Sequence, residues 1–166
     1  SLFQITLQEQ SFRGKPMPKF YEDLKVGDKF VTPRRTITEA DIVAFSGLSG
    51  DYNALHTDEI FAAETQFGGR IAHGPLGFVI ATGLSNRTGL FDGSTIAFLG
   101  MQWKFTAPIY PGDTVHLEMT VDELRRTSKP DRGILVREMN LINQKGQLVQ
   151  TGMFTTMIKV RDPAAE

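Results

Sequence analysis

The sequence predicts a single α+β domain in which a curved antiparallel sheet wraps around one long helix. Two observations carry this prediction. A nearly continuous apolar stretch from Pro75 to about Thr88 has the length of a helix and is apolar on all sides. Four runs rich in Val, Ile, Thr, Phe and Met follow it, separated by turn signals, and long strands joined by short turns form an antiparallel sheet. Because such a helix has to be buried, the sheet is expected to enclose it.

Composition and charge exclude several classes of protein. The 18 basic and 19 acidic residues are scattered and give a net charge of −1, so neither a nucleic-acid partner nor a membrane partner is expected. No apolar run is long enough to cross a bilayer. The absence of cysteine excludes disulfides, thiolate metal sites and cysteine nucleophiles, and it fits a reducing compartment. We therefore expect a cytoplasmic protein.

The chain divides into an arm and one domain. Residues 1–20 are polar, contain one glycine and two prolines, and show no sustained periodicity, so they are expected to form an N-terminal arm. Residues 21–166 are enough for one domain with a sizeable core. The first regular element predicted in this domain is a strand from Lys29 to Ile37.

Two short helices are predicted after this strand. Thr38 and Asp41 have the spacing of a capping box, with Asp in place of the usual Glu, so a helix begins there and is expected to end near Gly47. A second short helix is expected over residues 58–65, and a pair of glycines stops it. Its predicted packing side consists of Ile60, Phe61 and Ala62.

The central helix is expected to begin at Pro75, because proline is well tolerated in a first helical turn. It should run to about Thr88, fully buried. After it the apolar period becomes that of strands, which gives about five strands in total when the early strand is included. The four later strands are predicted over residues 95–106, 113–126, 132–144 and 147–160.

An acid and an imidazole, Asp51 and His56, lie five residues apart in a segment predicted to be irregular. Two of the three histidines of the chain, His56 and His73, lie between Ser49 and Gly77. Loops held by a rigid scaffold often carry functional side chains, and Asn53 between the two residues can fix a turn through its amide. The pattern therefore suits acid/base chemistry on a carbonyl-bearing substrate. It is equally typical of a plain polar turn in which His56 caps or lines the next helix.

A second feature lies at His73 and Gly74, immediately before the central helix. The first turn of a helix presents free backbone N–H groups and the positive end of the helix dipole, and glycine lets a ligand approach that backbone closely. A thioester or amide oxygen bound there would be polarised as in an oxyanion hole. The alternative is that Gly74 only permits a tight turn and that His73 is hydrogen-bonded in a partly buried loop.

These residues resemble a known family. The segment GDYNALH at residues 50–56, followed by GRIAHG at residues 69–74, is similar to the signature of the MaoC-like dehydratases, which include the (R)-specific enoyl-CoA hydratases with a hot-dog fold. The segments 20–28 and 105–113 are also similar to strands of that family, so the likeness extends over most of the chain. One departure is Ala54, where the family usually has proline.

The resemblance implies a fold and a set of roles. The fold is a long central helix wrapped by a curved antiparallel sheet, assembled as a homodimer or as a higher oligomer built from dimers. Asp51 and His56 are the implied catalytic pair, and the Gly74 N–H is the implied ligand of the thioester oxygen. The residues expected to support them are Asn53, His73 and Thr82. The side chains expected to line the acyl pocket are Phe78 and Val79.

The implied reaction is the reversible hydration of a 2-enoyl-CoA to the (R)-3-hydroxyacyl-CoA, a hydro-lyase step of fatty acid metabolism. No cofactor is expected, because the substrate itself carries CoA. A metal site is not expected in a chain with three histidines and no cysteine. Arg70, Arg87 and Lys104 are candidates for contacts with the CoA phosphates.

Three alternative functions stay open. The substrate could be a branched or carboxylated acyl-CoA of the mesaconyl-CoA or methylmalyl-CoA type. The protein could be a hot-dog acyl-CoA thioesterase, which attacks the carbonyl carbon instead of C3. It could also be a non-catalytic subunit that binds acyl thioesters, although such a subunit would be expected to have lost the Asp and His.

Overall fold

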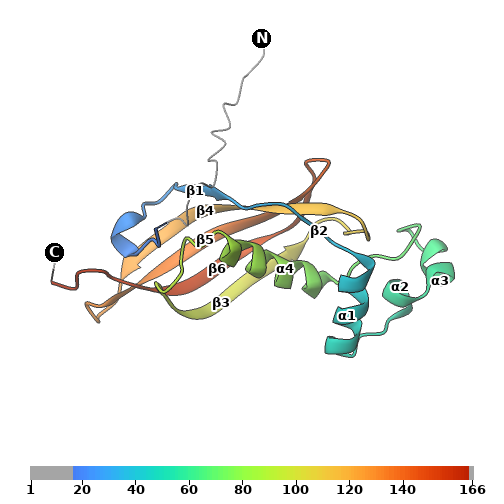
Figure 1. Cartoon of the computed structure of the whole chain (residues 1–166), viewed down its shortest axis with the longest axis horizontal. Helices are drawn as coiled ribbons and strands as arrows, with labels where there is room; N and C mark the ends of the chain where they lie inside the picture. The colour runs from blue at the N-terminus through green and yellow to red at the C-terminus, as the bar shows by residue number, and fades with distance from the viewer. Residues whose placement is uncertain (1–16, 165–166) are drawn as a thin grey trace, which may run out of the picture.

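A six-stranded antiparallel sheet and one long helix make up the body of the molecule (Figure 1). The computed structural model describes residues 17–164, so almost all of the arm predicted for residues 1–20 lies outside the described residues. The strand order is β1-β4-β5-β6-β3, and β2 pairs with β4 as well. Within residues 17–164, no helix has the length and apolarity needed to cross a membrane.

The four long strands confirm the prediction from the apolar runs, with bounds that differ by no more than one residue. Consecutive long strands pair antiparallel through β4, β5 and β6, and β3 adds to the free side of β6. Alternate side chains of β4 and β5 are buried, which places one face of the sheet in the core. The strands are β3 (Thr95–Phe105), β4 (Thr114–Arg126), β5 (Arg132–Asn143) and β6 (Leu148–Lys159).

The helix α4 (Gly74–Arg87) lies along the curved sheet, as predicted (Figure 1). Its core-facing side chains contact the apolar face of the sheet, and the helix interior residues Leu76, Ile80 and Leu84 are almost fully buried. The expectation that α4 is buried all round is wrong. Val79 is 47% exposed, because the sheet covers only one side of the helix and the other side stays open in the single chain.

The early strand is divided in two. β1 (Lys29–Val31) and β2 (Arg35–Thr36) both pair with β4, but the segment between them does not continue the ladder, so the prediction of one strand from Lys29 to Ile37 is wrong. Pro33 lies in this gap, and proline has no N–H to donate to a neighbouring strand. The hydroxyl of Thr32 accepts a hydrogen bond from the Leu117 N–H at 2.9 Å and so bridges the break.

Three short helices lie beyond one end of the sheet (Figure 1). The helix α1 (Glu39–Ser49) begins with the predicted capping box and ends two residues later than expected. The next residue, Gly50, has a φ of 78°, a left-handed conformation that favours glycine. The helix α3 (Glu59–Ala63) confirms the second short helix, but of its predicted packing side only Ala62 is buried, whereas Ile60 and Phe61 are exposed. The two elements not predicted are the helix α2 (Ala54–Thr57) and the 3-10 helix η1 (Tyr21–Asp23).

The capping box of α1 should contribute measurably to stability. The Thr38 hydroxyl accepts from the Asp41 N–H at 3.2 Å, and the Asp41 carboxylate accepts from the Thr38 N–H at 2.9 Å. We expect Thr38→Ala to lower the free energy of unfolding by about 1 kcal/mol, measured by chemical denaturation. Thr38→Ser keeps the capping hydroxyl and should stay close to the wild type. Equal stability of all three proteins would contradict this role.

Candidate active site

The carboxylate of Asp51 is held at the end of α1 by short local hydrogen bonds. The chain turns at Gly50, and the Ser49 hydroxyl then accepts from the Asp51 N–H at 3.1 Å. One oxygen of the Asp51 carboxylate accepts from the Asn53 N–H at 3.1 Å. The side chain is 51% exposed, so its second oxygen can reach a ligand.

The imidazole of His56 faces this carboxylate from α2. The Asn53 side chain caps that helix by accepting from the Leu55 N–H at 3.0 Å, so the predicted role of Asn53 in fixing the turn is confirmed. His56 Nδ1 lies 2.8 Å from the Ile71 carbonyl oxygen, which can only accept, and so Nδ1 carries the proton of the neutral ring. The lone pair of Nε2 is then free, and Nε2 lies 3.9 Å from an Asp51 carboxylate oxygen.

The distance between Asp51 and His56 decides what the pair can do. At 3.9 Å the two atoms are too far apart for a direct hydrogen bond, but both can contact one water molecule placed between them. An ionised carboxylate and a neutral imidazole are both proton acceptors. The pair is therefore suited to hold a water and to remove a proton from it.

His73 is the buried support of this pair. It is 1% exposed, and its ring stacks on the His56 ring with centroids 3.9 Å apart. Its Nε2 lies 3.0 Å from the Asp51 carbonyl oxygen and 3.3 Å from the Ser46 hydroxyl. Because a carbonyl only accepts, Nε2 donates, and His73 ties the acid-bearing loop to the residue that precedes α4.

The same three side chains lie close together but do not suit a metal ion. One donor atom from each of Asp51, His56 and His73 lies within 4.8 Å of the others. However, the two imidazole planes are stacked at 29°, so their in-plane lone pairs do not point to a common centre. One nitrogen of each ring is already a donor to a backbone carbonyl. The arrangement therefore fits a bound water better than a metal ion.

Gly74 is the first residue of α4 and opens onto a cavity of about 350 Å³. Within residues 17–164 its N–H has no recorded acceptor, and its carbonyl oxygen accepts from Gln150 Nε2 at 3.0 Å. A Cβ added at Gly74 would lie 2.8 Å from the Phe105 ring, so glycine is the residue that allows this close packing. A helix-start N–H without a protein acceptor, on a residue that lines a cavity, is a suitable donor to a carbonyl oxygen.

The remaining predicted residues lie further along α4. The Thr82 hydroxyl donates to the Val79 carbonyl oxygen at 2.6 Å, and within the described residues no hydrogen bond joins Thr82 to Asp51. The Phe78 ring packs edge-on against the rings of Trp103 and Phe154 and lines a cavity of about 450 Å³. Val79 lies on the exposed side of the helix.

Several residues of this region were not predicted from the sequence. Ser46 is buried under His73, and Gln150 connects Gly74 to the Trp103 indole N–H, which donates to its side-chain oxygen at 2.8 Å. Neither residue has a sequence signal that marks it. Arg137 has a sequence signal, because it occupies an inward position in the alternating apolar pattern of β5.

Among the candidates for CoA phosphates, Arg70 is already occupied. Its guanidinium donates to the carboxylates of Glu39 and Glu59, and so connects α1 with α3. Hydrogen bonds to Glu39 and then to Glu59 raise the pKa of Arg70 above its usual value. Two carboxylates therefore neutralise this cation, which makes it a poor ligand for a phosphate.

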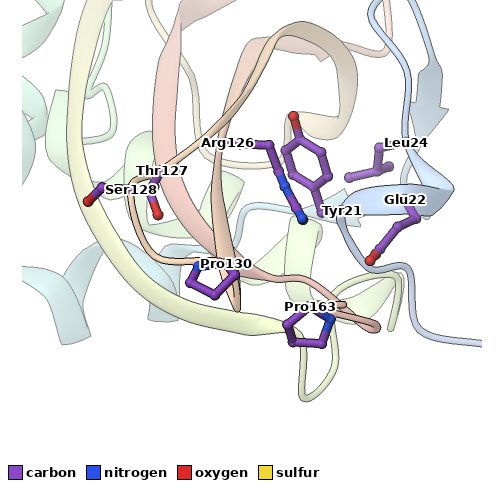
Figure 2. Close-up of a pocket in the computed structure, with 8 residues that line it drawn as sticks. All are labelled: Tyr21, Glu22, Leu24, Arg126, Thr127, Ser128, Pro130 and Pro163. Carbon is purple, nitrogen blue, oxygen red and sulfur yellow. The ribbon is translucent and has the colours of Figure 1, made fainter. Parts of the chain in front are cut away.

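A cavity of about 690 Å³ lies at the other end of the sheet, away from α1, α2 and α3 (Figure 1). Figure 2 shows its lining, with the Arg126 guanidinium beside the Tyr21 ring at 5.5 Å from its centroid. Glu22 lines it too, but its carboxylate accepts from the Arg161 N–H at 2.9 Å. This cavity has no paired acid and imidazole, so the candidate site is the one built on Asp51 and His56.

Comparison with known proteins identifies the family. A family model described as a MaoC-like domain matches residues 23–139. The chain is 43% identical over 121 residues to Protein MaoC of Klebsiella aerogenes, covering 72% of this chain but only 35% of that protein. It is 35% identical to the (R)-specific enoyl-CoA hydratase of Rhodospirillum rubrum, covering 86% of this chain and 93% of that protein.

A solved structure supports the same conclusion. The MaoC-like dehydratase from Rhodospirillum rubrum has a TM-score of 0.78 and 31% sequence identity to this chain, with 87% of this chain and 99% of that chain covered. Together with the sheet curved around α4, this likeness confirms the predicted hot-dog fold. By its sequence and its fold, this chain belongs to the family of MaoC-like domain proteins.

Proposed function

We propose that the protein is a hydro-lyase that reversibly hydrates a 2-enoyl-CoA to the (R)-3-hydroxyacyl-CoA. The observation that carries this proposal is the Asp51 carboxylate 3.9 Å from His56 Nε2, a spacing that suits one shared water. The likeness to the (R)-specific enoyl-CoA hydratase of Rhodospirillum rubrum supports it, since that relative is covered almost over its full length.

Each chemical requirement of hydration has a residue that suits it. The oxygen of the shared water forms a bond to C3 while a proton leaves it for Asp51 or His56. The electron pair of the C2–C3 double bond moves toward the thioester, and the charge on the thioester oxygen is stabilised by the Gly74 N–H. A proton is then delivered to C2, so H and OH add across the former double bond. The reverse sequence is dehydration.

The geometry also supports a stereochemical outcome. If one water supplies both the hydroxyl at C3 and the proton at C2, both groups add to the same face of the double bond. Asp51, in the connection between α1 and α2, and His56, in α2, hold this water between them, and Gly74 fixes the thioester at the start of α4. The expected product is therefore the syn adduct, and its R configuration is expected from the likeness to the (R)-specific enoyl-CoA hydratase of Rhodospirillum rubrum. The proposed steps need no metal or organic cofactor. The cytoplasmic location stays a prediction.

We further propose that the working unit is a homodimer. In the described chain, β3 pairs only with β6, so its other edge is open to a second copy. This edge strand is long, and large apolar side chains along it are between about two-fifths and three-fifths exposed, which is unusual for a monomer. These side chains are Ile96, Phe98, Leu99, Met101 and Phe105.

One assay distinguishes the proposed reaction from its alternatives. The protein is incubated with crotonyl-CoA, and loss of the enoyl absorbance and release of free thiol are followed together. A hydratase removes the enoyl absorbance and releases no thiol. A thioesterase releases thiol at the rate of substrate loss, and a binding subunit changes neither signal. Either of the last two results would overturn the proposed function.

A further inference from the structure

A buried arginine with no charged partner lies in the core of the sheet. Arg137 occupies an inward position of β5 between the buried residues Leu135 and Met139, and it is 6% exposed. Within residues 17–164, no carboxylate forms an ion pair with it. A buried charge is costly unless it is paired, so this residue needs an explanation.

Every recorded contact of the Arg137 guanidinium is to a neutral group. Nη1 donates to the Ser85 hydroxyl at 3.1 Å and to the Met119 sulfur at 3.6 Å, and Nη2 donates to the Thr156 hydroxyl at 3.4 Å. The centroid of the Phe91 ring lies 4.6 Å from the guanidinium carbon. Within the described residues, the buried Nε of Arg137 has no hydrogen-bond acceptor. Burial lowers the pKa of Arg137 to about 10, which still leaves it charged at neutral pH.

Arg137 lines the same cavity as Phe78, a space of about 450 Å³. Of the nine other lining residues, four are phenylalanines and five, such as Thr82, are polar but uncharged. A cavity with phenylalanine rings, no carboxylate and one fixed cation fits a ligand that has an apolar chain and is anionic at one end. A carboxylate matches the planar fork of a guanidinium and forms two parallel hydrogen bonds with it.

This cavity lies against the face of α4 that also carries Gly74. Phe78 and Thr82 follow Gly74 at intervals of four residues, and Ser85 continues the same face. The eleven residue steps from Gly74 to Ser85 correspond to about 16 Å along the helix axis. A thioester fixed at Gly74 would therefore send a medium-length acyl chain along this face toward the Arg137 guanidinium.

We infer that Arg137 binds a carboxylate at the far end of the acyl chain, and that the preferred substrates are 2-enoyl-CoA thioesters with an ω-carboxylate. This inference rests on the proposed function only for the position of the thioester at Gly74. The carboxylate supplies the missing partner of a buried cation, and the aromatic walls hold the methylene chain between the two ends.

The test uses pairs of trans-2-enoyl-CoA substrates of equal length, one ending in a methyl group and one in a carboxylate, from four to ten carbons. For the wild type we expect kcat/KM to favour the carboxylated member at least tenfold at the best length. A ratio of one or less at every length would overturn the inference.

Two variants assign the preference to Arg137. Arg137→Met removes the charge and should lower the ratio of kcat/KM values toward one. Ser85→Asp places a carboxylate against the guanidinium and keeps its charge paired, so it should also abolish the preference. This second variant provides the test if Arg137→Met does not fold. Arg132→Met, on the same strand, removes a cation already paired with Asp131 and should keep the wild-type ratio. Retention of the preference in both test variants would overturn the inference.

A binding measurement separates this inference from the proposed reaction. Calorimetry with saturated, unreactive acyl-CoA and ω-carboxyacyl-CoA pairs reports the preference even if the wild type hydrates no enoyl-CoA. Tighter binding of the carboxylated member without hydration would support the Arg137 site and reject the proposed reaction. Hydration with equal binding of both members would reject the Arg137 site alone.

Discussion

Asp51→Asn and His56→Ala should each lower kcat for crotonyl-CoA hydration by about 10²- to 10⁴-fold, the usual contribution of a positioned acid or base. Asn cannot accept a proton from water, and Ala leaves the space of the Nε2 lone pair empty. Neither side chain belongs to the buried apolar core, so the fold should be retained. The measurement is the initial rate of loss of the enoyl absorbance at saturating substrate.

A matched control is the third histidine. His116 lies on β4, and its contact is with the Glu118 carboxylate at 3.3 Å, apart from the candidate site. His116→Ala should therefore hydrate crotonyl-CoA at the wild-type rate. Near-normal rates for both Asp51→Asn and His56→Ala, with unchanged circular dichroism, would remove the pair from the mechanism.

Gly74→Ala should reduce hydration by at least about tenfold, because the added methyl group crowds the donor that stabilises the thioester oxygen. The new Cβ would lie 2.8 Å from the Phe105 ring, which has to move into the cavity next to the helix start. The effect should fall on kcat/KM for the enoyl thioester, measured by steady-state kinetics.

Gly83→Ala is the control on the same helix. A Cβ at Gly83 meets no atom within 4 Å, and alanine is a better helix former than glycine by about 0.5–1 kcal/mol. This variant should be slightly more stable and as active as the wild type. If Gly74→Ala kept full activity, space next to the Gly74 N–H would not limit the reaction, and this prediction would be wrong.

The sequence predicted those parts of the fold that follow from local periodicity. The capping box at Thr38, the long helix after Pro75 and the four long strands all have strong local signals, and all are present. The errors arise where other forces compete. Pro33 interrupts a strand that propensity alone would continue, and the four-residue helix α2 is too short to produce a periodic pattern. The exposure of Val79 depends on which side of the helix the sheet covers, which no local pattern encodes.

For the site, the sequence identified Asp51, His56, His73 and Gly74, and the structure brings the first three together around one point. Their catalytic roles stay predictions. Arg137 was missed because a single charged residue in a strand is ordinarily assigned to the solvent face, although its place in the apolar alternation of β5 is an inward one. The partners of this guanidinium come from distant segments, so spacing along the chain gives no indication of them.

The central claim is that one water, held by Asp51 and His56, is added to one face of an enoyl thioester fixed at Gly74. The most direct test is hydration of crotonyl-CoA in D₂O, followed by determination of the product configuration at C3 and of the position of deuterium at C2. We predict (R)-3-hydroxybutyryl-CoA with the deuterium added syn to the hydroxyl group. The S product, or deuterium added on the opposite face, would contradict this mechanism.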